Sequence, residues 1–367
     1  MQGKMERIGG AGATLTVDHG QVSGPDHIDI AIKDQGTAGG FLMDWLESQP
    51  SFKTLGGVGH RVVHGMQHTE PERITTQLLD ELKSIMPFDP EHLPREIELI
   101  EALRRRHGTL PQFACFDTAF HRSMPLVATQ LPIPRRYAAR GVQRYGFHGL
   151  SFTFLMQELA RLGDPAAAQG RIILAHLGSG ASLAAVRDGK CIDTSMGFTP
   201  TAGLVMGTRS GDLDPGLMSY LALTDAMSAS QFRTMVNHES GLLGISEISA
   251  DVRDLLARET NDPRAAEALA LFCYQAKKWI GAFAAALGGL DTLVFAGGIG
   301  ENAAPVRKRI CDGLEYLGIG IDENANSRHA QCISNDAAES VRVRVIRTDE
   351  EAVIAASTIR LLEPGPT

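Results

Sequence analysis

Three short, largely apolar runs follow one another in the middle of the chain. They occupy residues 172–177, 181–186 and 191–194, with a Gly-Ser-Gly between the first two and an Asp-Gly before the third. Apolar runs of this length separated by such turns predict two consecutive β-hairpins. Glycines on either side of a serine can expose backbone N–H groups to an anion, although no Gly-Lys-Ser/Thr follows as in a Walker loop. The segment therefore predicts an anion-binding turn inside a β-hairpin.

The remaining apolar positions predict alternating strands and helices. In residues 91–107 they recur at helical spacing, which indicates an amphipathic helix. Further strands are predicted at 4–10, 13–20, 56–65, 111–121, 291–302 and 341–350. Further helices are predicted at 38–49, in most of 216–288, from 305 and at 350–362. A glycine-rich loop is predicted at 196–215. The two halves have similar plans, but only the second opens with a strand–glycine–strand hairpin. The pattern indicates an α/β protein with a structural repeat.

Composition narrows the class of protein. A chain of 367 residues exceeds one ordinary core, which favours two domains. The net charge of −8 argues against a nucleic-acid partner. Five scattered cysteines favour a reducing compartment over a disulfide or metal framework. Because no apolar run has membrane-spanning length and the start lacks a signal-peptide core, we expect no membrane association and a cytoplasmic location.

Four segments place polar side chains where a purely structural chain does not need them. Arg61 lies at the end of the strand "GGVGHRVVHG", and Asp117 follows the apolar strand in "FACFDTAFH". His148 lies among aromatic and glycine residues in "RYGFHGLS", and Arg209 is the only cation of the glycine-rich loop. Arg209 could instead be a paired surface arginine, Arg61 a satisfied strand-end arginine and His148 a core or capping residue. Strand ends of open α/β sheets are nevertheless where ligands bind.

Two further segments resemble nucleotide and metal sites. "VFAGGIGENAAPVRKRI" is a strand, a glycine turn and a helix, whose N-terminus can hold a phosphate, although it does not match G-x-G-x-x-G. "RTDEEAVIA" places acidic residues before a helix, where they either stabilise the helix dipole or hold magnesium through water. Together, the glycine turns, isolated arginines, histidines and strand-end carboxylates indicate nucleotide-dependent phosphoryl transfer, which depends on positioning and charge stabilisation.

These segments, in this order, resemble the acetate/propionate kinase family. The resemblance covers nearly the whole chain from about residue 57 onward and rests on "GHRVVHG", "FDTAFHRSMP", "RYGFHGLS", "HLGSGAS", "DTSMGFTPTAGLVMGTRSGDLDP", "ESGLLGISE", "FAGGIGEN" and "TDEEAVIA". It implies the duplicated ribonuclease-H-like α/β fold of sugar kinases, Hsp70 and actin, with an active-site cleft between two domains. Residues 1–120 plus 352–367 then form the N-terminal domain, and residues 121–351 form the C-terminal, nucleotide-binding and dimerisation domain.

The resemblance also implies the reaction, ATP + acetate ⇌ ADP + acetyl phosphate, in a homodimer with Mg²⁺ (Mn²⁺ as the alternative). It implies that Arg61 binds the acetate carboxylate beside Val62 and that Glu350 is the metal-associated glutamate. The implied catalytic residues are Asp117, His148 and Arg209. The segments that resemble ATP-binding ones contain His176, Leu177, Gly178, Ser179, Gly180, Asp251, Val252, Arg253, Gly298, Ile299, Gly300, Glu301 and Asn302.

Three departures from the family pattern stand out. Ser179 replaces the asparagine of a His-Leu-Gly-Asn-Gly turn. A histidine that the family has in an "APLH" segment is absent, because "MPFDPEHLP" has Asp89 at that point; whether His92, three residues on, takes its place is open. The family's leading strand, Asn-x-Gly-Ser-Ser-Ser turn and second strand do not precede "MQGKMERIGG", which implies either a start codon placed too late or a natural, impaired chain. Loss of that hairpin predicts unpaired backbone edges in the N-terminal domain.

The alternatives to acetate kinase come from two classes. Within the enzyme class, a propionate or butyrate kinase would use the same residues on a longer acid. From a different class, the chain would be a nucleotide-binding but catalytically impaired, truncated homologue. Acyl preference and physiological direction are not encoded in any of these motifs.

Overall fold

The computed structural model of the 367-residue chain describes residues 2–6, 13–19, 24, 26–30, 35–335 and 341–363. Parts of the predicted strands at 4–10 and 13–20 lie outside these residues. Within them, strands and helices alternate as expected for an α/β protein. Nowhere in the described part of the chain is a helix both long and apolar enough to cross a membrane.

The N-terminal strands form a small antiparallel sheet of their own. It has the order β1 (Gln2–Glu6), β2 (Thr14–Asp18), β3 (Asp26–Asp29). Alternate residues of β2 are buried, and Leu15 and Val17 belong to an apolar cluster with Ala38 of helix α1 (Gln35–Ser48). The period-two pattern of "TLTVD" therefore places one face of the strand against the helix.

A second sheet carries the strand ends that the sequence singled out. Strand β4 (Val58–Val62) pairs in parallel with β6 (Gln112–Phe116), which pairs on its other side with the short antiparallel β5 (Glu72–Arg73). Helix α3 (Leu93–Arg106) buries the predicted apolar stripe, and α2 (Thr76–Ser84) packs beside it. Among the described residues, β4 pairs with no strand but β6, so its other edge carries no ladder.

The third sheet confirms the predicted pair of hairpins. Its order is β11 (Arg342–Val345), β10 (Thr292–Ala296), β7 (Arg171–Leu177), β8 (Ala181–Arg187), β9 (Lys190–Thr194). Strands β7, β10 and β11 run parallel, and β8 and β9 turn back as hairpins. Residues of one face pack with α12 (Pro263–Leu287), and those of the other pack with α6 (Gly149–Arg161). Both faces are covered, which is why these strands read as continuous apolar runs.

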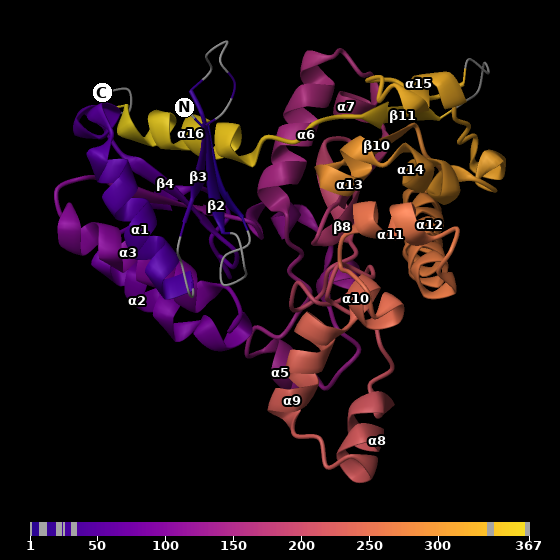
Figure 1. Cartoon of the computed structure of the whole chain (residues 1–367), viewed down its shortest axis with the longest axis horizontal. Coiled ribbons are helices and arrows are strands. Elements are labelled where there is room, and N and C mark those ends of the chain that lie inside the picture. Colours follow the sequence, from indigo (N-terminus) through magenta and orange to yellow (C-terminus); the bar gives the residue numbers. More distant parts are fainter. Residues whose placement is uncertain are drawn as a thin grey trace.

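The closing helix α16 (Glu350–Leu362) joins the sheets. It leaves the third sheet after β11 and packs against both α6 and β4, as Figure 1 shows. Gly59 makes this approach close, because a Cβ at that position would lie 2.4 Å from side-chain atoms of Ile354 and Thr358. The first residue of α16, Glu350, thereby lies beside the carboxyl end of β4.

The other elements are short. They are the α-helices α4 (Leu126–Thr129), α5 (Arg135–Ala138), α7 (Ala166–Gln169), α8 (Gly216–Thr224), α9 (Ala229–Thr234), α10 (Gly241–Ser246), α11 (Val252–Arg258), α13 (Gly297–Asn302), α14 (Ala304–Cys311) and α15 (Glu323–Ser327), the 3₁₀-helices η1 (Pro50–Thr54), η2 (Met86–Phe88), η3 (Ala119–Ser123) and η5 (Glu315–Leu317), and the π-helix η4 (Met235–Glu239). The glycine-rich loop between β9 and α8 has no regular element, as predicted.

Candidate active site

The carboxyl ends of β4 and β6 bring Arg61 and Asp117 together. Arg61 lies opposite Cys115 in the parallel ladder, and Asp117 follows two residues later. The Arg61 guanidinium donates to one oxygen, Oδ2, through Nε at 2.9 Å and Nη2 at 2.5 Å. This negative neighbour raises the pKa of Arg61 above its ordinary value, although burial opposes the shift. The other oxygen, Oδ1 of Asp117, is buried and has no hydrogen-bond partner.

Glu350 adds a second carboxylate to this pair. Its Oε2 lies 3.8 Å from Nε of Arg61. Burial and the nearby charge of Asp117 together raise the pKa of Glu350 to about 7, although Arg61 opposes the shift. Among the described residues there is no group of three or more His, Cys, Asp or Glu side chains that could by itself hold a metal. Oδ1 of Asp117, which has no hydrogen-bond partner, and Glu350, whose pKa is raised, nevertheless fit a hydrated divalent cation. Such a cation would take its other ligands from phosphates and water.

His148 lies over the glycine turn of the first hairpin. It precedes α6 in a left-handed conformation, with φ of 59°, and its ring stacks on His176 with centroids 4.3 Å apart. Its Nδ1 lies 2.8 Å from Oγ of Ser182. Burial, with contributions from His176, Arg61 and Arg209, holds the pKa of His148 well below its ordinary value. The imidazole is therefore neutral, with one nitrogen to donate and one to accept.

Gly180 shows how close His148 and Arg209 come to the turn. A Cβ at Gly180 would lie 3.2 Å from Nε2 of His148 and 3.6 Å from Nη1 of Arg209. The absence of a side chain leaves space between these two groups and the backbone of the turn. Residues that the sequence placed in separate motifs thus converge on the predicted anion-binding turn.

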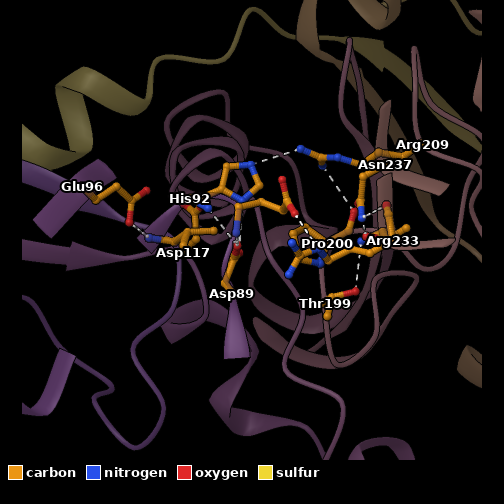
Figure 2. A network of polar contacts seen from close by, with 12 residues as sticks. Asp89, His92, Glu96, Asp117, Thr199, Pro200, Arg209, Arg233 and Asn237 are labelled. Atoms are coloured by element: carbon orange, nitrogen blue, oxygen red, sulfur yellow. Dashed lines mark hydrogen bonds and ion pairs between the residues drawn. The ribbon is translucent and has the colours of Figure 1, made fainter. Parts of the chain in front are cut away.

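Among the described residues, no carboxylate forms an ion pair with Arg209. Its Nη1 contacts the carbonyl oxygen of Pro200 at 3.3 Å and Sδ of Met206 at 3.8 Å, and its Nη2 lies 3.2 Å from Nε2 of His92. Burial lowers the pKa of Arg209, and the more distant charge of Asp89 partly offsets that effect. Figure 2 shows the contact between Arg209 and His92.

The glycine turn after β10 differs from its prediction. Residues 297–302 form the short helix α13 in place of a turn that precedes a helix. Gly297, with φ of 75°, is needed here, because a Cβ would lie 2.7 Å from the carbonyl oxygen of Leu177. Oε1 of Glu301 accepts from the backbone N–H groups of Gly297, at 2.9 Å, and Thr348, at 3.1 Å. The Glu301 carboxylate therefore ties α13 to the segment that leads into Glu350.

The other predicted ATP-binding segments lie around the same turn. The backbone N–H of Gly207 donates to the carbonyl oxygen of Ser179 at 3.0 Å, which ties the hairpin to the glycine-rich loop. A Cβ at Gly207 would also lie 3.3 Å from the carbonyl oxygen of Ala250. Asp251 follows directly, caps α11 and accepts from the backbone N–H of Arg253 at 2.9 Å. These contacts place residues 251–253 next to the hairpin.

Several candidate side chains have structural surroundings. Val62 follows Arg61 in β4, and its side chain is fully buried in the main core cluster. His60 lies 2.7 Å from Oε1 of Gln112, and His121 lies 2.9 Å from the carbonyl oxygen of Phe147. Burial lowers the pKa of His64 to about 4. All three histidines are buried, so none of them is placed to exchange a proton with a substrate.

The sequence reading missed a polar chain that connects the hairpin to α16. Nδ1 of His176 lies 2.8 Å from Oγ of Ser151, and this hydroxyl lies 2.8 Å from Oγ1 of Thr348. Ser151 was visible only as the last letter of "RYGFHGLS", in a helix position where a serine is unremarkable. No pattern in the sequence pairs it with residues 25 and 197 positions away.

Comparisons with known proteins agree along the whole chain. Residues 1–356 match the sequence profile of the acetokinase family. The chain is 44% identical over 326 residues to an acetate kinase of Rhodopseudomonas palustris, covering 88% of this chain and 81% of that protein. It is 41% identical over 367 residues to a propionate kinase of Citrobacter rodentium, covering 98% and 90%. The crystal structure of Porphyromonas gingivalis acetate kinase superimposes with a TM-score of 0.86 at 33% identity, covering 99% and 93%. The predicted duplicated ribonuclease-H-like fold is confirmed.

Proposed function

Because the chain belongs to the acetokinase family and is therefore a phosphotransferase, we propose that it transfers the γ-phosphoryl group of ATP reversibly to acetate. An acetate oxygen attacks the γ-phosphorus, and the bond from that phosphorus to the β,γ-bridging oxygen breaks. ADP leaves with the bonding electron pair, and acetyl phosphate is formed. This reaction needs positioning and charge stabilisation and no covalent enzyme intermediate.

The convergence of His148 and Arg209 on Gly180 carries the proposal. The turn supplies backbone and open space, Arg209 supplies a positive charge, and His148 supplies a neutral ring nitrogen. When Ser182 donates to Nδ1 of His148, the proton of the ring resides on Nε2, which faces the turn. Both groups then donate to equatorial oxygens of the transferring phosphoryl group, where negative charge is stabilised in the transition state.

Arg61 is suited to hold the acetate carboxylate. Asp117 takes Nε and Nη2 of its guanidinium, and the side chain remains 43% exposed, so N–H groups are left for a substrate. The Asp117 contact fixes the plane of the guanidinium, which favours a defined orientation of a bound carboxylate. This arrangement supports the acceptor role that the family resemblance implies for Arg61.

We assign the metal to the side of the site formed by Asp117 and Glu350. Oδ1 of Asp117 and the Glu350 carboxylate would hold the waters or a direct ligand position of Mg²⁺, with Mn²⁺ as its alternative. A bound divalent cation neutralises the charge that accumulates on the β- and γ-phosphates. In this proposal, ATP and ADP bind at residues 176–180 of the first hairpin, 251–253 at the start of α11 and 298–302 of α13.

A homodimer through residues 121–351 is part of the proposal, as is the division into domains at 1–120 plus 352–367 and 121–351. Helix α8 has no buried residue and lies away from the sheets in Figure 1. Leu223 is 87% exposed and Tyr220 is 62% exposed, which is unusual for neighbouring large apolar residues in an unpartnered helix. Light scattering of the chain, compared with a Leu223→Glu variant, tests this contact: a dimer that the variant converts to monomer supports it.

Acetyl phosphate formation from Mg·ATP and acetate tests the reaction directly. Parallel assays with propionate and butyrate test the alternative acceptors. Of these two acids, propionate is supported by the 41% identity to a propionate kinase. The highest kcat/KM on acetate supports the proposal, and a higher value on propionate replaces it with propionate kinase. ATP binding without acid-dependent ADP release identifies the second alternative, a catalytically impaired homologue.

A further inference from the structure

The site holds its two arginines in different ways. Arg61 is paired directly with the Asp117 carboxylate, whereas the Arg209 guanidinium contacts a carbonyl oxygen, a thioether and an imidazole. Within the residues that the structure describes, no carboxylate forms an ion pair with Arg209. A direct carboxylate partner would compete with a phosphoryl group for the same N–H donors. An uncharged acceptor can fix the guanidinium while leaving its charge for the substrate.

His92 is that uncharged acceptor. Its Nε2 lies 3.2 Å from Nη2 of Arg209, and its Nδ1 lies 2.9 Å from Oδ1 of Asp89. Asp89 also accepts from the backbone N–H groups of Glu91, at 3.2 Å, and His92, at 3.0 Å. Although burial opposes it, the hydrogen bond from His92 lowers the pKa of Asp89, so the carboxylate is ionised. Figure 2 shows His92 between Asp89 and Arg209.

The two end groups set the donor and acceptor roles along this line of hydrogen bonds, which runs from Asp89 through His92 to Arg209. Ionised Asp89 can only accept, so Nδ1 of His92 carries the proton. The guanidinium of Arg209 can only donate, so Nε2 must accept with a lone pair and carry no proton. A proton on Nε2 would place two donors against each other. The line is therefore consistent in one tautomer only, and Asp89 selects that tautomer.

We propose that His92, oriented by Asp89, is the positioning residue that fixes the Arg209 guanidinium for phosphoryl transfer. This inference rests on the proposed function for its kinetic test. Asp89 and His92 come from the segment between η2 and α3, and Arg209 comes from the glycine-rich loop, so the contact joins elements 117 positions apart. Fixing the guanidinium from outside its own loop limits the positions from which it can reach the phosphoryl group.

A neighbouring contact provides a matched control. The segment that carries Asp89 and His92 lines a cavity of about 760 Å³ together with η4. At this cavity Nε2 of His238 lies 3.0 Å from Oε2 of Glu91. This second histidine joins the same segment to η4 instead of the glycine-rich loop, through Glu91 and not through Arg209. A His→Phe change at each position removes one bridging imidazole and keeps an aromatic ring. The pair of variants separates loss of a bridge from loss of the Arg209 contact.

The test measures steady-state kinetics and thermal unfolding of His92→Phe, His92→Gln and His238→Phe beside the unaltered chain. We expect His92→Phe to lower kcat by about 10- to 100-fold, with KM for ATP and acetate changed by less than about threefold. Glutamine can donate to Asp89 and accept from Arg209, so His92→Gln should restore kcat to within about fivefold. His238→Phe should stay within about twofold on every kinetic parameter.

Three results overturn the inference. They are a His92→Phe enzyme with unchanged kcat, a His92→Gln enzyme as impaired as His92→Phe, and an equal loss of kcat in His238→Phe. If His92→Phe does not fold, Asp89→Asn replaces it. An amide at residue 89 lets His92 adopt the other tautomer and turn a donor toward Arg209, so kcat should fall by about tenfold. Unchanged kcat in Asp89→Asn rejects the inference.

Binding of ADP with Mg²⁺ and aluminium fluoride separates this inference from the proposed function. The planar fluoride complex imitates the transferring phosphoryl group and needs no acceptor turnover. We expect His92→Phe to weaken its binding by about tenfold while the affinity for ADP alone is unchanged. If the unaltered chain forms no acyl phosphate but shows this difference, the proposed function fails and the positioning role stands. Equal binding by both proteins rejects the positioning role.

Discussion

Both N–H donors that join Arg61 to Asp117 end on one carboxylate oxygen. Nε and Nη2 donate to Oδ2, at 2.9 and 2.5 Å, and leave Oδ1 buried and unpartnered. A structural ion pair in this position would gain most from a bidentate contact that uses both oxygens. In the proposed site, this asymmetry lets one oxygen orient the arginine and keeps the other available for the metal and its waters.

Asp117→Asn should separate these two tasks. The amide oxygen can still accept from Arg61, so the unfolding midpoint should change little, because Arg61 also reaches solvent. The loss of negative charge beside the metal position should lower kcat by about 100-fold and raise the Mg²⁺ concentration needed for half-maximal rate. A magnesium titration of initial rates checks this expectation. Full activity in the variant would remove Asp117 from the catalytic residues.

Arg209→Ala should act on turnover with little effect on nucleotide binding. The guanidinium is partly buried and has no carboxylate partner among the described residues, so its removal leaves no described carboxylate unpaired and should not lower thermal stability appreciably. We expect kcat to fall by about 100- to 1000-fold and KM for ATP to change by less than about threefold. Equal losses in kcat and ATP affinity would instead mean that Arg209 binds the ground-state nucleotide.

Sequence patterns predicted the elements of this site better than its connections. The β7–β8–β9 hairpins, the buried stripe of α3 and the strand-end positions of Arg61 and Asp117 follow from local periodicity and turn chemistry. Strand β5 was missed, because two residues carry no period. The short helix α13 was read as a turn, since glycine-rich segments of six residues fit both.

The contacts between distant residues were not visible in the sequence. His92 could be noted as a histidine near a changed motif, but its approach to Arg209 depends on how the segment before α3 meets the glycine-rich loop. The link from Glu301 to Thr348 spans 47 positions and uses backbone N–H groups, which have no signature in side-chain identity. Local patterns report neighbours along the chain, whereas these contacts are set by packing of the sheets.

Glu96 should make stability depend on pH. Burial raises the pKa of Glu96 to about 8, while the N–H of Val63, 2.9 Å from Oε2, and the charge of Arg61 oppose the shift. The folded chain therefore holds this proton more tightly than the unfolded chain, whose glutamate has a pKa near 4.5. Stability that is fully present below about pH 4.5 is then lost progressively as pH rises to about 8.

Glu96→Gln isolates that contribution. Glutamine keeps an oxygen for the Val63 N–H but does not titrate. Relative to the unaltered chain, the variant should be more stable at pH 8.5 than at pH 5, by on the order of 4 kcal/mol. Urea unfolding of both proteins at the two pH values measures the difference. A stability difference independent of pH would mean that Glu96 is ionised throughout.

Glu301 should affect the KM for ATP, because it joins α13 to the segment that leads into α16. Its Oε1 accepts from the N–H groups of Gly297 and Thr348, so a neutral side chain of the same length keeps the acceptor and a short one does not. We expect Glu301→Gln to raise KM for ATP by less than about threefold. Glu301→Ala leaves two backbone donors without that acceptor and should raise KM for ATP by about tenfold and lower the unfolding temperature. Nucleotide titrations and thermal unfolding of both variants check this. A large rise in KM with glutamine, at unchanged stability, would show that the carboxylate charge itself contacts the nucleotide or its metal.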